Sequence, residues 1–210
     1  MKAHLKVTKQ SLPYHVERSF FNALKHTTKE HGYTGPFARI EFLAARMKDH
    51  WFQVISRILP FNGVRVKLQK MRGVMIAKDV HIGPMVTIDD VYPYFVSIGR
   101  GSSIAGNNFI LTHTKPLAYH SEVSEAYVAP VVIGKNVWVA INVTILPGVT
   151  IGDGSIIASG SVVTKSIPPL VFAAGIPAVV KKDIALKLKK NYSDEEFTTI
   201  LDKRKVEFGF

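Results

Sequence analysis

Histidine is the side chain best suited to accept a proton near neutral pH, and this chain of 210 residues has eight histidines and no cysteine. His113 stands apart because it lies where a regular aliphatic pattern ends and an irregular polar stretch begins. That stretch, residues 112–130, holds further groups that can bind or orient a ligand: Lys115, Tyr119, His120, Glu122, Glu125 and Tyr127. We take His113 as the candidate general base, with His120 as the alternative base and Glu122 or Glu125 as the orienting partner. A loop histidine that bonds only to backbone is the structural alternative.

The aliphatic pattern before and after this stretch has a period of six. From Ile133 it runs without a slip through Val139, Ile145, Ile151, Ile157 and Val163. The fifth residue of each block is also compact: Val137, Val143, Val149, Ser155, Ser161 and Ile167. A period of six fits neither an amphipathic helix nor a half-buried strand, but it is typical of a β-helix. Three blocks then close a triangular coil of about 18 residues, with first and fifth residues pointing inward.

The same count locates two breaks in the stack. Blocks start at Ile76, Ile82 and Ile88, and again at Ile98, Ile104 and Ile110. The first break adds four residues around Val91–Tyr94, directly after Asp89 and Asp90. The second break separates Ile110 from Ile133 and adds about 17 residues, so residues 112–130 must leave the stack as a loop. A long loop on a regular scaffold is where we expect function.

Residues 37–59 have a helical period instead, and Pro60 and Gly63 end it. The apolar members fall on one broad face: Ile40, Leu43, Ala44, Met47, Trp51, Val54, Ile55, Ile58 and Leu59. We expect this face to pack on the end of the β-helix or on a partner subunit. The second interpretation is an amphipathic helix that makes a peripheral contact with a membrane surface.

After Ile167, Pro168 and Pro169 are expected to end the ladder, since proline cannot donate to it. A charged helix follows over residues 183–206, with Ser193 and Glu196 as a capping box. The predicted domains are a basic, largely helical extension (1–60), the β-helix (61–182, with a loop at 112–130) and the C-terminal helix (183–210).

The net charge of +11 is concentrated near the N-terminus. Residues 1–72 contain 14 Lys/Arg and 4 Asp/Glu, whereas residues 73–210 contain 13 and 12. A basic arm could bind nucleic acid, an anionic membrane or a phosphorylated substrate. A solvated helix face with no partner explains the excess of Lys and Arg equally well. The sequence has no cysteine, no apolar leader and no apolar run of about 18 residues. These features favour a cytoplasmic protein whose contact with a membrane, if it makes one, is peripheral.

Four segments carry a family resemblance. Residues 136–139 (NVWV), 145–152 (ILPGVTIG), 160–169 (GSVVTKSIPP) and 174–177 (AGIP) occur in that order and spacing. Over about residues 60–185 the chain resembles the hexapeptide-repeat acyltransferases, and most closely the maltose/galactoside O-acetyltransferase-like and polysaccharide O-acetyltransferase group. The resemblance implies a left-handed parallel β-helix, a homotrimer with active sites in the clefts between subunits, and direct acyl transfer from coenzyme A bound along the coils.

The resemblance also implies roles for individual residues. His113 matches the catalytic histidine of the family. An acidic residue at the first break, Asp89 or Asp90, is implied to hold the acceptor hydroxyls, and a local turn role is the alternative. Asn107 and His120 are further candidates for acceptor binding. From its inward position alone, Asn108 is expected to be structural, in a ladder of amide hydrogen bonds. Binding of acetyl-CoA, the co-substrate, falls to Trp138, Ala140, Ile141, Ser159, Thr164, Lys165, Lys181 and Lys182. No metal is expected.

Two departures from the family pattern affect the donor site. Where relatives often have Gly-Ser, this chain has Ala140-Ile141, so a backbone N–H near that pair is left to stabilise the oxyanion. The arginine expected after the Gly-Ile-Pro turn is replaced by Val179. Lys181 and Lys182 then take over the phosphate contact as point charges.

The predicted function is an acetyl-CoA-dependent O-acetyltransferase that acts on a hydroxyl of a sugar or surface-polysaccharide precursor, without a nucleic-acid partner. One alternative is N-acetylation of an amino sugar on the same scaffold. Another is a zinc enzyme like the gamma-type carbonic anhydrases, with His81, His113 and His120 as ligands. The third is a non-catalytic scaffold.

Overall fold

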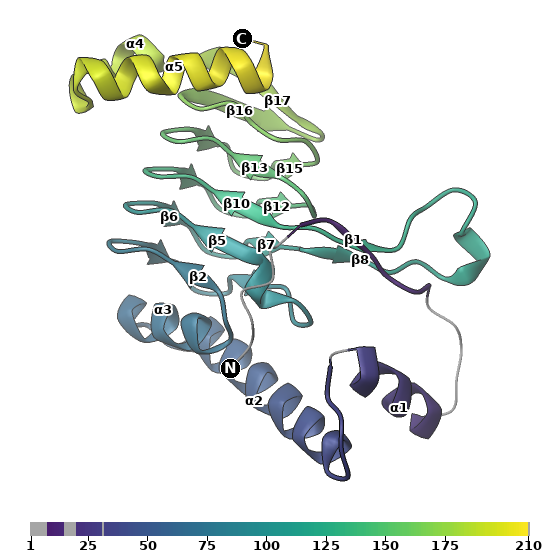
Figure 1. The fold of residues 1–210 in the computed structure, drawn as a ribbon. Coiled ribbons are helices and arrows are strands. Elements are labelled where there is room, and N and C mark those ends of the chain that lie inside the picture. The colour runs from purple at the N-terminus through teal and green to yellow at the C-terminus, as the bar shows by residue number, and fades with distance from the viewer. Residues whose placement is uncertain (1–7, 15–19, 31, 210) are drawn as a thin grey trace.

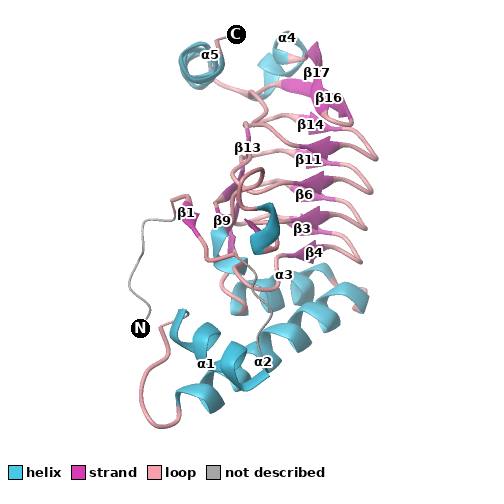
Figure 2. Ribbon diagram, turned by 90° about the vertical axis from the view of Figure 1, so that its right-hand side faces the viewer, coloured by secondary structure: helices cyan, strands magenta, loops and turns pink. Residues whose placement is uncertain are grey.

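The computed structural model describes residues 8–14, 20–30 and 32–209. Three parallel sheets, here called I, II and III, form the sides of a triangular β-helix (Figures 1 and 2). Sheet I consists of β2 (Met75–Ile76), β5 (Val96–Ile98), β10 (Val131–Ile133) and β13 (Thr150–Ile151). Sheet II begins with β3 (His81–Ile82), β6 (Ser103–Ile104), β11 (Trp138–Val139) and β14 (Ile156–Ile157). Sheet III consists of β4 (Thr87–Ile88), β7 (Phe109–Ile110), β12 (Thr144–Ile145) and β15 (Val162–Val163).

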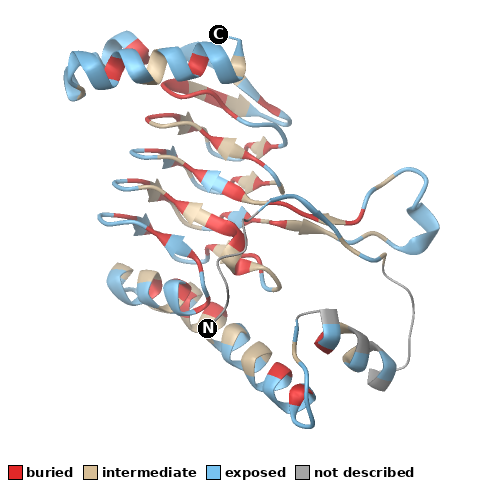
Figure 3. Cartoon of the chain, in the orientation of Figure 1, coloured by how far each residue is buried: buried red, intermediate tan, exposed pale blue. Residues whose placement is uncertain are grey.

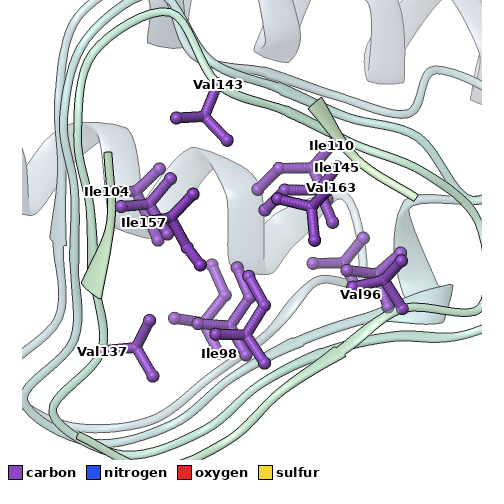
Figure 4. Close-up of a cluster of buried hydrophobic side chains, with 14 of the residues drawn as sticks. Val96, Ile98, Ile104, Ile110, Val137, Val143, Ile145, Ile157 and Val163 are labelled. Atoms are coloured by element: carbon purple, nitrogen blue, oxygen red, sulfur yellow. The ribbon is translucent and has the colours of Figure 1, made fainter. Parts of the chain in front are cut away.

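The predicted hexads set the register of these sheets. Each aliphatic first residue ends a strand and pairs with the equivalent residue of the next coil, as Ile88 does with Ile110. Their side chains stack in columns inside the triangle and are buried (Figure 4). The expected β-helix, with its helical N-terminal region and C-terminal helix, is therefore confirmed.

Polar fifth-position residues are buried in the same core and are hydrogen-bonded there. Asn108 is fully buried, donates from Nδ2 to the Ala105 carbonyl and accepts at Oδ1 from the Val143 N–H. Ser155 donates to the Pro168 carbonyl and accepts from the Val171 N–H. The structural role predicted for Asn108 is thus confirmed, although its partners are backbone groups rather than the predicted ladder of amide side chains.

Both breaks in the count are insertions at one corner of the coil. The first contains the 3-10 helix η1 (Pro93–Phe95). The second is an antiparallel hairpin of β8 (His113–Thr114) and β9 (Tyr127–Val128), with the 3-10 helix η2 (Ala118–His120) in its loop. The hairpin projects from the stack as expected, and β1 (Gln10–Ser11) pairs with β9 (Figure 1).

Three helices lie at the N-terminal end of the stack: α1 (Phe20–Glu30), α2 (Ala38–Ile58) and α3 (Asn62–Met71). The extent of α2 agrees with the prediction, whereas α3 was not predicted. The prediction that the apolar face of α2 packs on the β-helix is wrong. The face with Phe42, Gln53 and Ser56 is buried, and the predicted apolar face points outward.

The reason lies in the open edge of the first coil. A terminal coil presents backbone carbonyls that have no further strand to pair with, and these need donors. Gln53 on α2 donates to the Val86 carbonyl, and Arg65 on α3 donates from Nε to the Ile82 carbonyl at 2.6 Å. Polar side chains therefore face the stack, which leaves the apolar residues of α2 outside.

The C-terminal end also differs from the prediction. Pro168 and Pro169 do not end the ladder, because β16 (Val171–Gly175) pairs in parallel with β14 beyond them. An antiparallel partner, β17 (Ala178–Asp183), then completes sheet II. The end is covered by α4 (Ala185–Leu188), the 3-10 helix η3 (Lys189–Asn191) and α5 (Asp194–Phe208). The capping box predicted for Ser193 and Glu196 is confirmed at the start of α5.

None of the helices in the described residues combines the length and the hydropathy that a membrane crossing requires.

Candidate active site

The side chain of His113 is paired with that of Asp89. Nδ1 of the imidazole lies 2.6 Å from Oδ2 of the carboxylate. Asp89 directly follows β4, and His113 follows β7, the next strand of sheet III, after two residues. Because Ile88 pairs with Ile110, the residues leaving these two strands emerge side by side. The first break and the long hairpin therefore meet at one corner.

Asp89 is held from several sides and is buried. Its Oδ1 accepts the backbone N–H groups of Val91 and Tyr92, both at 2.9 Å. Its Oδ2 accepts the Thr112 N–H at 2.9 Å in addition to His113. Burial alone would raise the pKa of the Asp89 carboxyl, but the hydrogen bond and charge of His113, with the backbone donors, hold that pKa well below its usual range.

This environment determines which nitrogen of His113 is free. An ionised Asp89 can only accept hydrogen bonds, so Nδ1 of His113 carries the proton between them. Nε2 of the neutral ring is then a proton acceptor. The ring is partly exposed, and the edge-on ring of Tyr92 packs against it at 5.4 Å between centroids. A buried carboxylate that orients a partly exposed imidazole is an arrangement suited to general-base catalysis.

The loop after Asp89 is anchored from the helical end of the molecule. Arg72, just after α3, donates from Nη2 to the carbonyl of Asp89 at 2.9 Å and to that of Ile88 at 3.2 Å. Arg46 of α2 donates from Nη1 to the carbonyl of Asp90 at 2.5 Å. The helices thus fix the backbone that holds the His113–Asp89 pair.

The predicted orienting residues are elsewhere, which is a correction. Glu125 forms an ion pair with Lys9 at 2.8 Å, and Glu122 is exposed in the hairpin loop. Asp89 orients His113 in their place. The signal was present in the six-residue count, since Ile88 and Ile110 occupy equivalent positions in successive coils.

The predicted acceptor-binding residues are not gathered at one point. Both oxygens of Asp89 are used within the protein, so Asp89 serves His113 here rather than a ligand. Asp90 is exposed and lies 3.4 Å from Arg72. Asn107 has a left-handed backbone and donates to Asn142 at another corner. His120 is exposed in the hairpin loop, where its ring packs edge-on against Tyr119.

The predicted donor-binding residues line the outside of the coils. Trp138 and Lys182 belong to one row across sheet II, through Ile156 and Phe172, so they share its outer face. Both are exposed, as are the neighbouring Lys181, the turn residue Ser159, and Thr164 and Lys165 after β15. Ala140 cannot offer its N–H to an oxyanion, because that group donates to the Ile157 carbonyl at 3.0 Å. Within the described residues, the Ile141 N–H has no such backbone acceptor.

These residues divide between two corners of the triangle. Asp89, His113, Thr164 and Lys165 lie at the corner that follows sheet III. Asn107, Ala140, Ile141 and Ser159 lie at the corner that follows sheet II. One chain alone therefore does not bring His113 together with the Ala140–Ile141 pair.

The three histidines of the zinc alternative are also not brought together within the chain. His81 lies in β3, His113 is paired with Asp89, and His120 is in the hairpin loop. In the part of the chain that the structure describes, no three His, Cys, Asp or Glu side chains are grouped to hold a metal ion.

Comparisons with known proteins agree with this architecture. Residues 130–165 match the model of the bacterial transferase hexapeptide family (six repeats). Galactoside O-acetyltransferase of Escherichia coli (strain K12) is 41% identical over 124 residues, which cover 54% of this chain. The chain spans 59% of the length of that curated relative.

Two solved structures are similar in both sequence and fold. A maltose O-acetyltransferase from Clostridium difficile 630 is 28% identical, with a TM-score of 0.53 over 68% of this chain and 87% of that one. A galactoside acetyltransferase in complex with coenzyme A is 29% identical, with a TM-score of 0.53 over 72% of this chain and 86% of that one. With its three stacked sheets and its match to the hexapeptide repeats, the chain is similar in sequence and fold to the galactoside and maltose O-acetyltransferases.

Proposed function

We propose that this protein is an acetyl-CoA-dependent O-acetyltransferase that acetylates a hydroxyl of a sugar or glycan precursor, with His113 as the general base. The observation that carries the proposal is the His113–Asp89 pair at the corner where the long hairpin leaves the β-helix. The names of the similar proteins, galactoside and maltose O-acetyltransferases, support the class of reaction.

In the proposed reaction, Nε2 of His113 takes the proton from the acceptor hydroxyl while its oxygen attacks the thioester carbonyl. Asp89 stabilises the imidazolium that forms, because its carboxylate remains ionised and accepts from Nδ1. The tetrahedral intermediate then collapses, the bond from carbon to sulfur breaks, and the imidazolium returns the proton to the leaving thiolate. The products are the acetyl ester and free coenzyme A, and no other reactant is needed.

The donor would lie along the outer surface of the coils. Trp138 offers an exposed aromatic face in the same row as Lys182, and Lys181 and Lys182 can pair with phosphate groups. Thr164 and Lys165 lie at the same corner as His113. The Ile141 N–H is the proposed donor to the oxyanion, in place of the Ala140 N–H that the ladder uses. One of the similar structures is a complex with coenzyme A, which supports coenzyme A as the carrier of the acetyl group.

A second copy of the chain is required to complete the proposed site. His113 and the Ile141 N–H follow different sheets and lie at different corners. We infer a closed homotrimer in which the His113 corner of one subunit faces the Ile141 corner of its neighbour. Such head-to-tail contacts close into rings with equivalent sites.

The decisive experiment measures release of free thiol from acetyl-CoA with a panel of galactosides, maltose, other sugars and amino sugars. Mass spectrometry of the product identifies the acetylated position. We expect an ester, with activity lost in His113→Asn and retained in the control His50→Asn, whose ring is exposed on α2. Turnover that survives in His113→Asn, or stoichiometric zinc in the active protein, contradicts the proposal.

A further inference from the structure

The outward side of α2 is an extended apolar surface. Among the described residues, Ile40, Trp51 and Ile58 have exposed fractions of 67%, 53% and 69%. They alternate along the helix with other exposed apolar residues of the same side, and the exposed Phe61 follows in the link between α2 and α3. We call this surface the outer face of α2: Ile40, Leu43, Met47, Trp51, Ile58 and Phe61.

Packing within the described residues of the chain does not account for this surface. The opposite side of α2 makes the contacts with the stack, through Phe42, Gln53 and Ser56. Gln53 and Ser56 bond with Gln69 of α3, so that polar side is fully engaged. Both orthogonal views place α2 at the end of the molecule, and Figure 3 shows exposed residues along it (Figures 1, 2 and 3). An apolar row of this size on a free surface indicates an interaction site.

The charge around the outer face selects the partner. Residues 37–72 contain eight Lys/Arg and two Asp/Glu, and of the basic residues only Arg65 and Arg72 are buried against the stack. At 100° per residue, the exposed Arg39 flanks the outer face on one side, and the exposed Lys48 and Glu41 flank it on the other. A row of Trp, Phe, Ile and Met on a segment of net positive charge is the pattern of a helix that lies in the interface of an anionic bilayer. Two copies packed through this face would instead bring like charges together.

We propose that the outer face of α2 is a docking surface for membranes that contain anionic lipids. The helix lies parallel to the bilayer, with Trp51 and Phe61 at the level of the headgroups and the basic residues beside the phosphates. The polar inner side stays on the stack.

Docking in this way would bring the His113–Asp89 pair close to the lipid surface. Arg46 of α2 holds the Asp90 carbonyl, and α2 contacts β4, whose strand leads into Asp89. The candidate active site is thus at the α2 end of the β-helix rather than at the α5 end. An acceptor carried by a lipid would be presented to that corner, a consequence that rests on the proposed function.

Cosedimentation with vesicles tests the docking surface directly. The full chain is mixed with vesicles of phosphatidylcholine plus phosphatidylglycerol, or of phosphatidylcholine alone. We expect binding to the anionic vesicles that weakens as salt is raised. The double variant Trp51→Ser/Ile58→Ser should bind at least tenfold more weakly. The matched control Leu186→Ser/Val206→Ser, which removes two exposed apolar residues at the other end, should bind as the parent does.

A second readout follows Trp51 itself. The chain has two tryptophans, so Trp138→Phe leaves Trp51 as the only indole emitter. Its emission should shift to the blue on addition of anionic vesicles. Circular dichroism confirms that the variants fold, and light scattering gives their oligomeric state.

Three results would overturn the proposal. The first is the absence of binding to anionic vesicles, and the second is equal binding by the parent and the Trp51→Ser/Ile58→Ser variant. The third is a smaller assembly in that variant, because the outer face of α2 would then be a contact between copies of the chain. Vesicle binding needs neither acetyl-CoA nor acceptor. His113→Asn should therefore bind vesicles normally, which separates failure of docking from failure of the proposed reaction.

Discussion

Asp89 and His113 are 24 positions apart in the chain, yet their side chains meet at 2.6 Å. The contact arises because β4 and β7 are stacked in sheet III with Ile88 beside Ile110. The base is therefore oriented by a buried residue of the coil itself, whereas the acidic residues of the long hairpin lie away from it. A rigid support of this kind keeps Nε2 directed outward through the catalytic cycle.

Replacing His113 by asparagine should remove the base while keeping a polar side chain of similar reach. We expect kcat to fall by about 10²- to 10⁴-fold, the usual contribution of a general base. Coenzyme A binding, measured by calorimetry, should be unchanged, because His113 is not among the proposed donor-binding residues. A small loss of kcat would show that another group accepts the proton.

Asp89→Asn distinguishes orientation of the base from binding of the acceptor. An amide can donate to His113 and favour the tautomer with the proton on Nε2, which cannot act as a base. We expect kcat to fall by at least about 10²-fold with little change in the KM for the acceptor. A large rise in that KM with kcat preserved would instead support the acceptor-binding role predicted from the resemblance. Asp153→Asn, at a corner of the coil near the opposite end, is the matched control.

The low pKa of Asp89 also predicts how stability depends on pH. The folded protein holds the pKa of this carboxyl below its usual range, so the unfolded chain binds the proton more readily in acid. The stabilisation is complete above about pH 4, the usual value, and is lost as pH falls further. From neutral pH to about pH 3, the parent should lose about 1 kcal/mol more stability than Asp89→Asn in urea titrations. Equal losses would contradict the assigned pKa.

The periodic part of the fold was predictable from sequence because each coil requires the same residue types at the same positions. An aliphatic residue such as Ile104 or Val139 must point into the triangle, so the six-residue count determines strand ends and register together. The count also located both insertions, and local capping chemistry located the start of α5 at Ser193. His113 was singled out because it follows the last strand before the long insertion.

The features that were missed depend on contacts between elements. Nothing local in α2 shows that the open edge of the first coil needs donors such as Gln53, so the apolar face of α2 was predicted to pack on the β-helix or on a partner subunit. The strand β16 forms because β14 offers it an edge, although Pro168 and Pro169 precede it. Asp89 was taken for a ligand-binding residue because its pairing with His113 appears only when two coils are superimposed.

Arg72 tests how far the helical end supports the active site. Its guanidinium is buried, and it donates to the carbonyls of Ile88 and Asp89 and to side chains of α2 and α3. Arg72→Met should leave these acceptors unsatisfied and reduce the free energy of unfolding by about 2–5 kcal/mol. Arg100→Met is the matched control, because its ion pair with Asp79 is exposed and should contribute less than about 1 kcal/mol. Equal effects of the two substitutions would show that the buried network is not needed.

The donor side of the proposed site rests on Lys181 and Lys182 in place of the expected arginine, and a truncated donor tests them separately from the chemistry. If these lysines pair with a phosphate of coenzyme A, Lys181→Ala/Lys182→Ala should raise the KM for acetyl-CoA several-fold, with kcat little changed. If the lysines bind the 3′-phosphate, the parent should have a KM for acetyl-dephospho-CoA, which lacks this phosphate, that is higher than its KM for acetyl-CoA by the same factor. The KM of the variant should differ little between the two donors. Lys187→Ala/Lys189→Ala, which removes two exposed lysines farther along the chain, controls for net charge. An equal rise in the KM for acetyl-CoA in the two double variants would show that Lys181 and Lys182 act only by long-range attraction. The phosphate would then have no assigned partner.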